Sequence, residues 1–265
     1  MLQTFAGGAL FGSATGSPPA RVLALHGWAR THRDFDAVVR ATDGGVALGG
    51  PADGGPTSSG PALDAVAVDL PGFGATPPPP EPWGAAAYAA RVAAMLDEGE
   101  LATPVVVLGH SFGGRVAVCL AASRPELVRS LVLTGVPLLR TGPGRRPSPG
   151  FRLARGLHRV GLIGDDRMER ARQQHGSADY RAAEGVMRQI LVRSVGETYE
   201  EQLAAIDCPV RLVWGDDDRD VPLAVAERAA GRLADAQVTV CPGAGHLTPL
   251  TVPGTLRAAV DELLG

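Results

Sequence analysis

Ser111 lies at the centre of Gly109-His-Ser-Phe-Gly113, the one place where a serine of this chain fits the pattern G-x-S-x-G. The apolar, β-branched residues 105–108 before it predict a buried strand, and the Ala-rich residues after it, to Ala122, predict a helix. A serine at such a strand–turn–helix junction is held in a strained conformation with its hydroxyl exposed beside a helix N-terminus. Gly109 and Gly113 lack the Cβ atoms that would collide in so tight a turn. The pattern predicts nucleophilic attack by the Ser111 hydroxyl.

A serine nucleophile needs a base to take its proton, and the base needs an acid to orient it. Among the six histidines, His246 is the expected base because it follows the last predicted strand in Gly243-Ala-Gly-His246. His26 is expected to be a scaffold residue at a strand end, and the side chain of His110 is expected to point away from that of Ser111. The other three are expected on solvated helices or loops: His32, His158 and His175.

The expected acid lies in the loop after Trp214. The other common position for it follows residues 130–134, where the chain reads Gly-Val-Pro and offers no carboxylate. Four acids lie in the favoured loop: Asp216, Asp217, Asp218 and Asp220. The spacing favours Asp218, three residues beyond Gly215, and leaves Asp220 and Asp217 as alternatives.

The predicted elements alternate between strands and helices. Apolar runs predict strands over residues 21–25, 65–69, 105–108, 130–134, 209–214 and 237–241, and helices are expected over residues 33–40, 85–99, 223–233 and 255–264. Residues 1–17 are typical of an edge hairpin, and residues 41–62, rich in Gly, Pro and Ser, of a mobile surface loop. This alternation predicts an α/β fold with a mostly parallel, doubly wound central sheet flanked by helices. The carboxyl ends of its strands would meet at one crevice.

Residues 137–200 interrupt the alternation. They contain helical patterns around residues 151–160, 166–174 and 180–195 but no strand-like run, which predicts a helical cap inserted into a core formed by residues 1–136 and 201–265. This segment holds 12 Arg and 7 acidic residues, a net charge of +5, and the rest of the chain carries −8. Solvated helix faces are the simpler interpretation. The alternative is an anionic substrate or acidic partner that the cap attracts.

Composition narrows the class of protein. A chain of 265 residues with 45% hydrophobic residues and a net charge of −3 is typical of a globular protein, and its balance gives no nucleic-acid signature. The three cysteines lie far apart, without the spacing of a disulfide framework or a metal site. No signal peptide, membrane span, P-loop or dinucleotide motif is present, so we expect a cytoplasmic protein without metal or cofactor.

Five motifs in sequence order resemble those of the α/β-hydrolase fold superfamily. The order Ser111, Asp218, His246 is that superfamily's order of nucleophile, acid and base. The segments that carry the resemblance are His26-Gly27-Trp28, Asp69-Leu-Pro-Gly-Phe-Gly74, Gly109-His-Ser-Phe-Gly113, Gly215-Asp-Asp-Asp218 and Gly245-His246. They resemble, in turn, the oxyanion turn, the D-x-x-G-x-G turn, the nucleophile elbow, the acid turn and the base turn.

The resemblance implies a serine hydrolase with a helical cap. His246 would take the proton of Ser111, Asp218 would orient the imidazole, and the backbone N–H groups of Trp28 and Phe112 would stabilise the oxyanion. A serine at the elbow favours acyl transfer over epoxide or halide cleavage. We therefore expect a small-molecule acyl substrate, a carboxylic ester or thioester, hydrolysed through an acyl-enzyme. A carbon–carbon bond hydrolase of keto acids or diketones is the first alternative, and a catalytically lapsed binding protein is the second.

Overall fold

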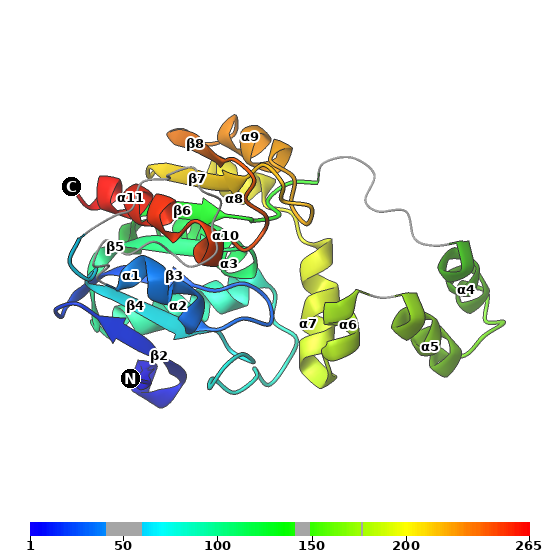
Figure 1. The fold of residues 1–265 in the computed structure, drawn as a ribbon. Coiled ribbons are helices and arrows are strands. Elements are labelled where there is room, and N and C mark those ends of the chain that lie inside the picture. The colour runs from blue at the N-terminus through cyan, green and yellow to red at the C-terminus, as the bar shows by residue number, and fades with distance from the viewer. Residues whose placement is uncertain (41–59, 141–148, 176) are drawn as a thin grey trace.

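A computed structural model describes residues 1–40, 60–140, 149–175 and 177–265. Its centre is an eight-stranded sheet in the order β1-β2-β4-β3-β5-β6-β7-β8 (Figure 1). β2 pairs antiparallel with β1 and β4, and every other pair is parallel. The strands are β1 (Gln3–Phe5), β2 (Leu10–Thr15), β3 (Ala20–Leu25), β4 (Ala65–Asp69), β5 (Leu101–His110), β6 (Val128–Thr134), β7 (Val210–Gly215) and β8 (Ala236–Cys241). The predicted mostly parallel sheet is confirmed, and β2 makes it a mixed one.

The register of the sheet aligns the strand ends on which the predicted site depends. One row across the five strands β3, β5, β6, β7 and β8 is formed by Leu25, Gly109, Leu133, Leu212 and Val238. The central strands are mainly apolar, as expected for strands that helices cover on both faces. Residues just beyond this row therefore meet at the carboxyl edge of the sheet.

Helices cover the sheet on both faces. On one face, η2 (His32–Phe35), α1 (Asp36–Val39) and α11 (Pro253–Leu264) bury Phe35, Val38 and Leu256. On the other face, α2 (Ala85–Asp97), α3 (Phe112–Ser123) and α9 (Ala224–Ala230) pack their apolar sides on the strands. The connections are completed by η1 (Ala6–Gly8), η3 (Pro125–Leu127) and α10 (Thr248–Thr251). The helix predicted over residues 33–40 is instead the 3-10 turn η2 followed by the single turn α1.

The insertion between β6 and β7 is helical, as predicted. Its described helices are α4 (Pro149–Arg159), α5 (Asp165–His175), α6 (Ala178–Ala182), α7 (Gly185–Gly196) and α8 (Glu200–Ala204). α7 packs on the core through two contacts. Met187 lies so close to Gly72 that a Cβ there would be 2.2 Å from its Sδ, and Arg193 Nη1 donates to the Pro82 carbonyl over 3.1 Å. Glu169 on α5 pairs with Arg188 on α7 at 2.7 Å. α4 and α5 extend away from the sheet (Figure 1).

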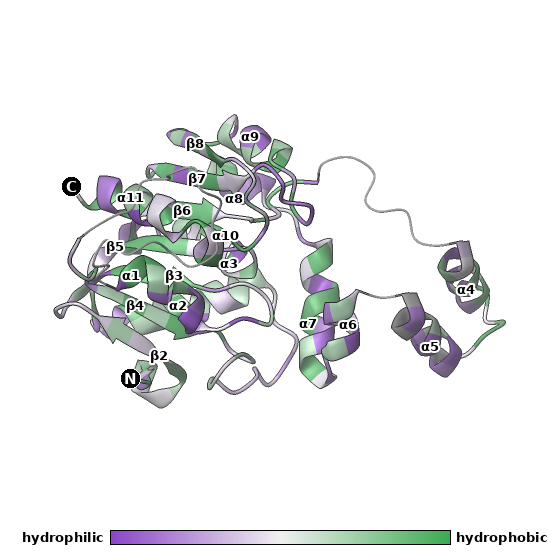
Figure 2. Ribbon diagram, in the orientation of Figure 1, coloured by the Kyte–Doolittle hydropathy of each residue, from purple (hydrophilic) through white to green (hydrophobic). Residues whose placement is uncertain are grey.

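Hydropathy follows the layers of the fold. The central strands are mainly hydrophobic, whereas α5 is mainly hydrophilic (Figure 2). Among the described helices, none combines the length and the apolar character needed to cross a bilayer. Residues 41–59 of the loop expected over residues 41–62 lie outside the described residues.

Candidate active site

Ser111 occupies the sharp turn between β5 and α3. Its φ of +48° and ψ of −109° lie in a region that non-glycine residues rarely adopt. Two hydrogen bonds hold the turn: Ser111 N–H donates to the Thr134 carbonyl over 2.9 Å, and Gly113 N–H donates to the His26 carbonyl over 2.9 Å. A Cβ at Gly113 would lie 2.1 Å from the Leu25 carbonyl oxygen, so only glycine allows α3 to approach β3 so closely. The neighbouring strands thus impose the strained serine conformation.

The three predicted side chains meet at the carboxyl edge of the sheet. Nε2 of His246 lies 3.2 Å from Ser111 Oγ, and Nδ1 of His246 lies 2.8 Å from Asp218 Oδ2. The carboxylate can only accept, so Nδ1–H is the donor to Asp218, and Nε2 is then free to accept the serine proton. This geometry suits proton transfer from a serine hydroxyl to a histidine.

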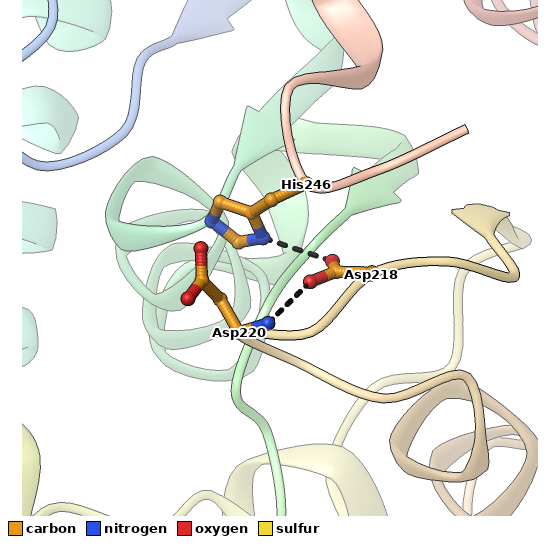
Figure 3. A group of neighbouring side chains, drawn as sticks. All are labelled: Asp218, Asp220 and His246. Atoms are coloured by element: carbon orange, nitrogen blue, oxygen red, sulfur yellow. Dashed lines mark hydrogen bonds and ion pairs between the residues drawn. The ribbon is translucent and has the colours of Figure 1, made fainter. Parts of the chain in front are cut away.

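The structure separates the acidic residues of the loop after β7. Asp218 is buried, and its Oδ1 accepts the N–H groups of Asp220 and Val221 over 2.9 and 2.8 Å, while its Oδ2 faces His246 (Figure 3). Asp217 pairs with Arg219 at the surface over 3.1 Å. Asp218 is therefore the carboxylate bonded to the imidazole, as its spacing favoured.

Two backbone N–H groups lie on turns that are tied to each other. Phe112 is the first residue of α3, so its N–H is among those that an α-helix leaves without an intrahelical partner. Trp28 follows His26 and Gly27, and the Gly113–His26 bond joins this turn to the elbow. A Cβ at Gly27 would lie 2.8 Å from His110 Nδ1, so the two turns are in close contact. Both turns therefore lie next to Ser111, and the role of the two amides as oxyanion donors stays a prediction.

The model of the Alpha/beta hydrolase family matches residues 22–259, which span the sheet from β3 onward, the insertion and all five motifs. This chain belongs to the alpha/beta hydrolase family.

The proteins that this chain resembles are named for different reactions. The chain is 27% identical to the 2-hydroxy-6-oxononadienedioate/2-hydroxy-6-oxononatrienedioate hydrolase of Cupriavidus pinatubonensis, with 95% of this chain and 89% of the relative covered. It is 33% identical to the pimeloyl-[acyl-carrier protein] methyl ester esterase of Neisseria meningitidis, with coverages of 68% and 61%. A bromoperoxidase from Bacillus anthracis shares the fold, with a TM-score of 0.69, 16% identity and coverages of 100% and 99%.

Two histidines of this alpha/beta hydrolase support the site without contacting Ser111 Oγ. His26 Nδ1 donates to the Gly27 carbonyl over 2.7 Å, and its Nε2 accepts the Leu70 N–H over 3.0 Å. His110 Nε2 donates to the His246 carbonyl over 3.0 Å. Burial lowers the pKa of both rings, and that of His110 falls to about 4. Both imidazoles are therefore neutral near pH 7, and the scaffold role of His26 stays a prediction.

The expectation for His32 is wrong. His32 is buried rather than solvated, and both its backbone N–H and its Nδ1 lie 2.8 Å from Asp69 Oδ1. The other carboxylate oxygen of Asp69 accepts the Ala75 N–H over 2.9 Å. The D-x-x-G-x-G turn thus folds around Asp69. A buried carboxylate needs hydrogen-bond donors, and the sequence pattern alone does not show which residues supply them.

Thr134 and Thr248 are contacts of the site that the sequence did not single out. Their hydroxyl oxygens lie 2.5 Å apart in the core, and Thr134 also accepts the Ser111 N–H through its carbonyl. The signal in the sequence that could have indicated this contact is Thr134 itself, a polar residue at the end of a buried strand, because buried polar groups need hydrogen-bond partners.

Other chemistries have weaker support at the site. Asp218, Asp220 and His246 form a group whose potential ligand atoms lie within 4.8 Å of one another, but both nitrogens of His246 already face protein partners. Burial raises the pKa of Cys119 to about 12 and that of Cys208 to about 11, and it also raises that of Cys241. The cysteines are therefore protonated thiols at neutral pH, which makes them poor nucleophiles.

Proposed function

We propose that this chain is a serine hydrolase that cleaves a carboxylic ester or thioester through an acyl-enzyme, with Ser111 as nucleophile, His246 as base and Asp218 as the acid that orients it. One observation carries the proposal. The ring of His246 bridges a serine in a strained elbow, at 3.2 Å, and a buried carboxylate, at 2.8 Å. This is the constellation that acyl transfer by a serine requires.

Acylation follows from these contacts. Ser111 Oγ attacks the carbonyl carbon as its proton moves to His246 Nε2, and the Asp218 carboxylate stabilises the imidazolium that forms. The oxyanion accepts hydrogen bonds from the N–H groups of Trp28 and Phe112. Donors of this kind are worth roughly 3–4 kcal/mol each in the transition state. Collapse of the tetrahedral intermediate breaks the bond to the leaving alcohol or thiol, which takes the proton from Nε2.

Deacylation uses the same groups in a second cycle. Water enters after the leaving group departs, His246 Nε2 takes its proton, and the resulting hydroxide attacks the acyl carbon. The second tetrahedral intermediate expels Ser111 Oγ, which recovers the proton, and a carboxylic acid leaves.

The surroundings of the two amides support an uncharged acyl group. The Trp28 ring packs edge-to-face on Phe73 at 5.0 Å and on Phe112 at 5.5 Å between ring centroids. Met187, on α7, lies against Gly72, in the turn that also carries Phe73.

We propose residues 1–136 and 201–265 as the catalytic core and residues 137–200 as the cap. We also propose a cytoplasmic site of action, which the three free cysteines support.

An anionic substrate has less support. Three of the cap arginines, Arg152, Arg155 and Arg159, line a hollow of about 640 Å³ along α4. α4 lies away from β5 and α3, between which Ser111 is held (Figure 1). In this arrangement their charge is remote from the reacting bond, whereas the carboxylate of Asp220 lies beside His246 (Figure 3).

Carbon–carbon bond hydrolysis is the second candidate. It is favoured by the 27% identity, over 95% of this chain, to a hydrolase named for oxononadienedioate substrates. The same serine, base and oxyanion donors would serve such a reaction. The ester proposal is preferred because a dioate brings two negative charges to a site where the carboxylates of Asp218 and Asp220 already lie near His246.

The test is covalent labelling combined with paired assays. A fluorophosphonate probe should label the wild-type protein and fail to label Ser111→Ala, and p-nitrophenyl esters should be hydrolysed faster than a vinylogous 1,5-diketone acid. Labelling with turnover of the diketone alone would replace the ester proposal by the carbon–carbon one. Absence of labelling would leave the catalytically lapsed binding protein as the better description.

A further inference from the structure

Asp220 lies next to the proposed triad without belonging to it. Its backbone is fixed, because its N–H donates to Asp218 Oδ1 over 2.9 Å and the next residue, Val221, donates to the same oxygen over 2.8 Å. The carbonyl of Val221 in turn accepts the buried Trp214 Nε1–H over 2.8 Å. These bonds hold residue 220 in one position relative to the imidazole that Asp218 orients.

The side chain of Asp220 points toward His246. A carboxylate oxygen of Asp220 and a ring nitrogen of His246 lie within 4.8 Å of each other, and the carboxylate approaches the imidazole from the side of its Nε2 atom (Figure 3). The side chain is solvent-exposed. Among the residues that the structure describes, no cation forms an ion pair with it, in contrast to Asp217, which pairs with Arg219 at 3.1 Å.

The other charged or titratable groups around His246 do not offset this charge. Asp218 is a second carboxylate on the same ring. His110, whose ring centroid lies 5.1 Å from that of His246, is neutral near pH 7 because burial lowers its pKa to about 4. Arg30 near His110 is already paired with Asp34 at 2.6 Å. Before proton transfer, two carboxylates, those of Asp218 and Asp220, therefore lie next to His246, and among the described residues no Arg is paired with either of them.

We propose that Asp220 is a specificity-determining residue that disfavours acyl groups carrying a negative charge near the scissile bond and favours neutral or cationic ones. The inference rests on the proposed ester hydrolysis. A fixed carboxylate raises the free energy of an anionic substrate at Ser111 and lowers that of a cationic one. At a solvent-exposed site with charges several ångströms apart, the effect on kcat/KM is about three- to tenfold and is screened by salt.

Three p-nitrophenyl esters with four-carbon acyl chains test the proposal: the neutral butanoate, the anionic hemisuccinate and the cationic 4-(trimethylammonio)butanoate. The measured quantity is the kcat/KM of each charged ester divided by that of the butanoate. For Asp220→Asn, the ratio should rise about three- to tenfold for the hemisuccinate and fall by a similar factor for the cationic ester. Asp220→Glu should keep the wild-type ratios because it keeps the charge.

Asp217→Asn is the matched control, since it removes the same charge from the same loop at a carboxylate that pairs with Arg219 instead of facing His246. It should leave both ratios unchanged. Added salt should raise the hemisuccinate ratio of the wild type and have little effect on that of Asp220→Asn. A fall with salt would instead support recruitment of anions by the cap.

Two failures are distinguishable. If the butanoate is hydrolysed and Asp220→Asn leaves both ratios as in the wild type, the role of Asp220 is overturned and the proposed function stands. If the butanoate is not hydrolysed and Ser111 is not labelled by a fluorophosphonate, the proposed function is overturned and the specificity role with it.

Discussion

The hydroxyl groups of Thr134 and Thr248 lie 2.5 Å apart in the core beside the proposed triad. Thr134 ends β6, and its carbonyl accepts the N–H of Ser111 over 2.9 Å. Thr248 begins α10, two residues after His246. Through this pair, β6 connects the turn that holds Ser111 to the loop that holds His246.

Replacing Thr134 by Val should therefore affect both stability and reactivity. The variant keeps the carbonyl but leaves the buried Thr248 hydroxyl without this partner, at an expected cost of about 1–3 kcal/mol in the free energy of unfolding. Urea denaturation measures this cost, and the rate of fluorophosphonate labelling reports the geometry of Ser111 and His246. Thr134→Ser, which keeps the hydroxyl, is the control. A Val variant with wild-type stability and labelling rate would show that the pair has no positioning role.

Variants of the proposed triad should lose far more activity than a variant of a surface residue in the same loop. Ser111→Ala and His246→Ala should lower kcat by at least about 10³-fold, and Asp218→Asn by a comparable factor because the imidazole loses its orienting acceptor. Esterase kinetics with a neutral p-nitrophenyl ester measure these changes. Asp217→Asn, in the same loop, should retain activity within about twofold, since surface substitutions of this kind have small effects. An Asp218→Asn variant with wild-type kcat would exclude this residue as the triad acid.

The close approach of α3 to β3 predicts a severe effect of Gly113→Ala. The added Cβ would lie 2.1 Å from the Leu25 carbonyl oxygen, a backbone atom that cannot move aside without shifting the sheet. We expect a loss of about 3 kcal/mol or more, at the upper end for overpacked sites. Gly156→Ala on α4 is the matched control, because nothing lies within 4 Å of its added Cβ. It should be neutral or stabilising by up to about 1 kcal/mol. Thermal denaturation of both variants checks the contrast.

The lowered pKa of the buried His110 imidazole predicts that the protein loses stability in mild acid. Burial lowers the pKa of its imidazole from 6.5 to about 4, so the unfolded chain binds a proton at a higher pH than the folded protein does. Stability is then complete above about pH 6.5 and falls as the pH drops toward 4, by up to about 3 kcal/mol. The change in slope between wild type and His110→Gln, measured by urea denaturation across this range, isolates the contribution. Equal slopes would show that another group dominates; His26, whose pKa burial also lowers, would be the next to test.

The parts of the site that local patterns determine were predictable from the sequence. Ser111 and His246 follow predicted strands, and strand ends of a parallel sheet must meet at one edge. The spacing of the acid loop favoured Asp218 and left Asp217 and Asp220 as alternatives, and the bond between Asp218 and His246 became visible only in the structure. These inferences need only the order of elements and the chemistry of a serine nucleophile.

Interactions between distant segments were not predictable in this way. His32 was expected to be solvated because it lies on a predicted helix or loop, yet its partner is Asp69, 37 positions away. The direction of the Asp220 side chain depends on how the loop folds around Asp218. β5 also begins at Leu101, earlier than its apolar run, because Leu101 pairs with Ala20 beyond a shift in register.

The insertion lies between β6 and β7, so it divides the proposed catalytic groups by position along the chain. The nucleophile and both amides come before it, and the acid and base come after it. A cut in the turn between α4 and α5 would yield two fragments, neither of them with a complete set of reacting groups. Within the sheet they would rejoin where β6 pairs with β7, and recovered esterase turnover would then be a direct readout of two separate polypeptides assembling.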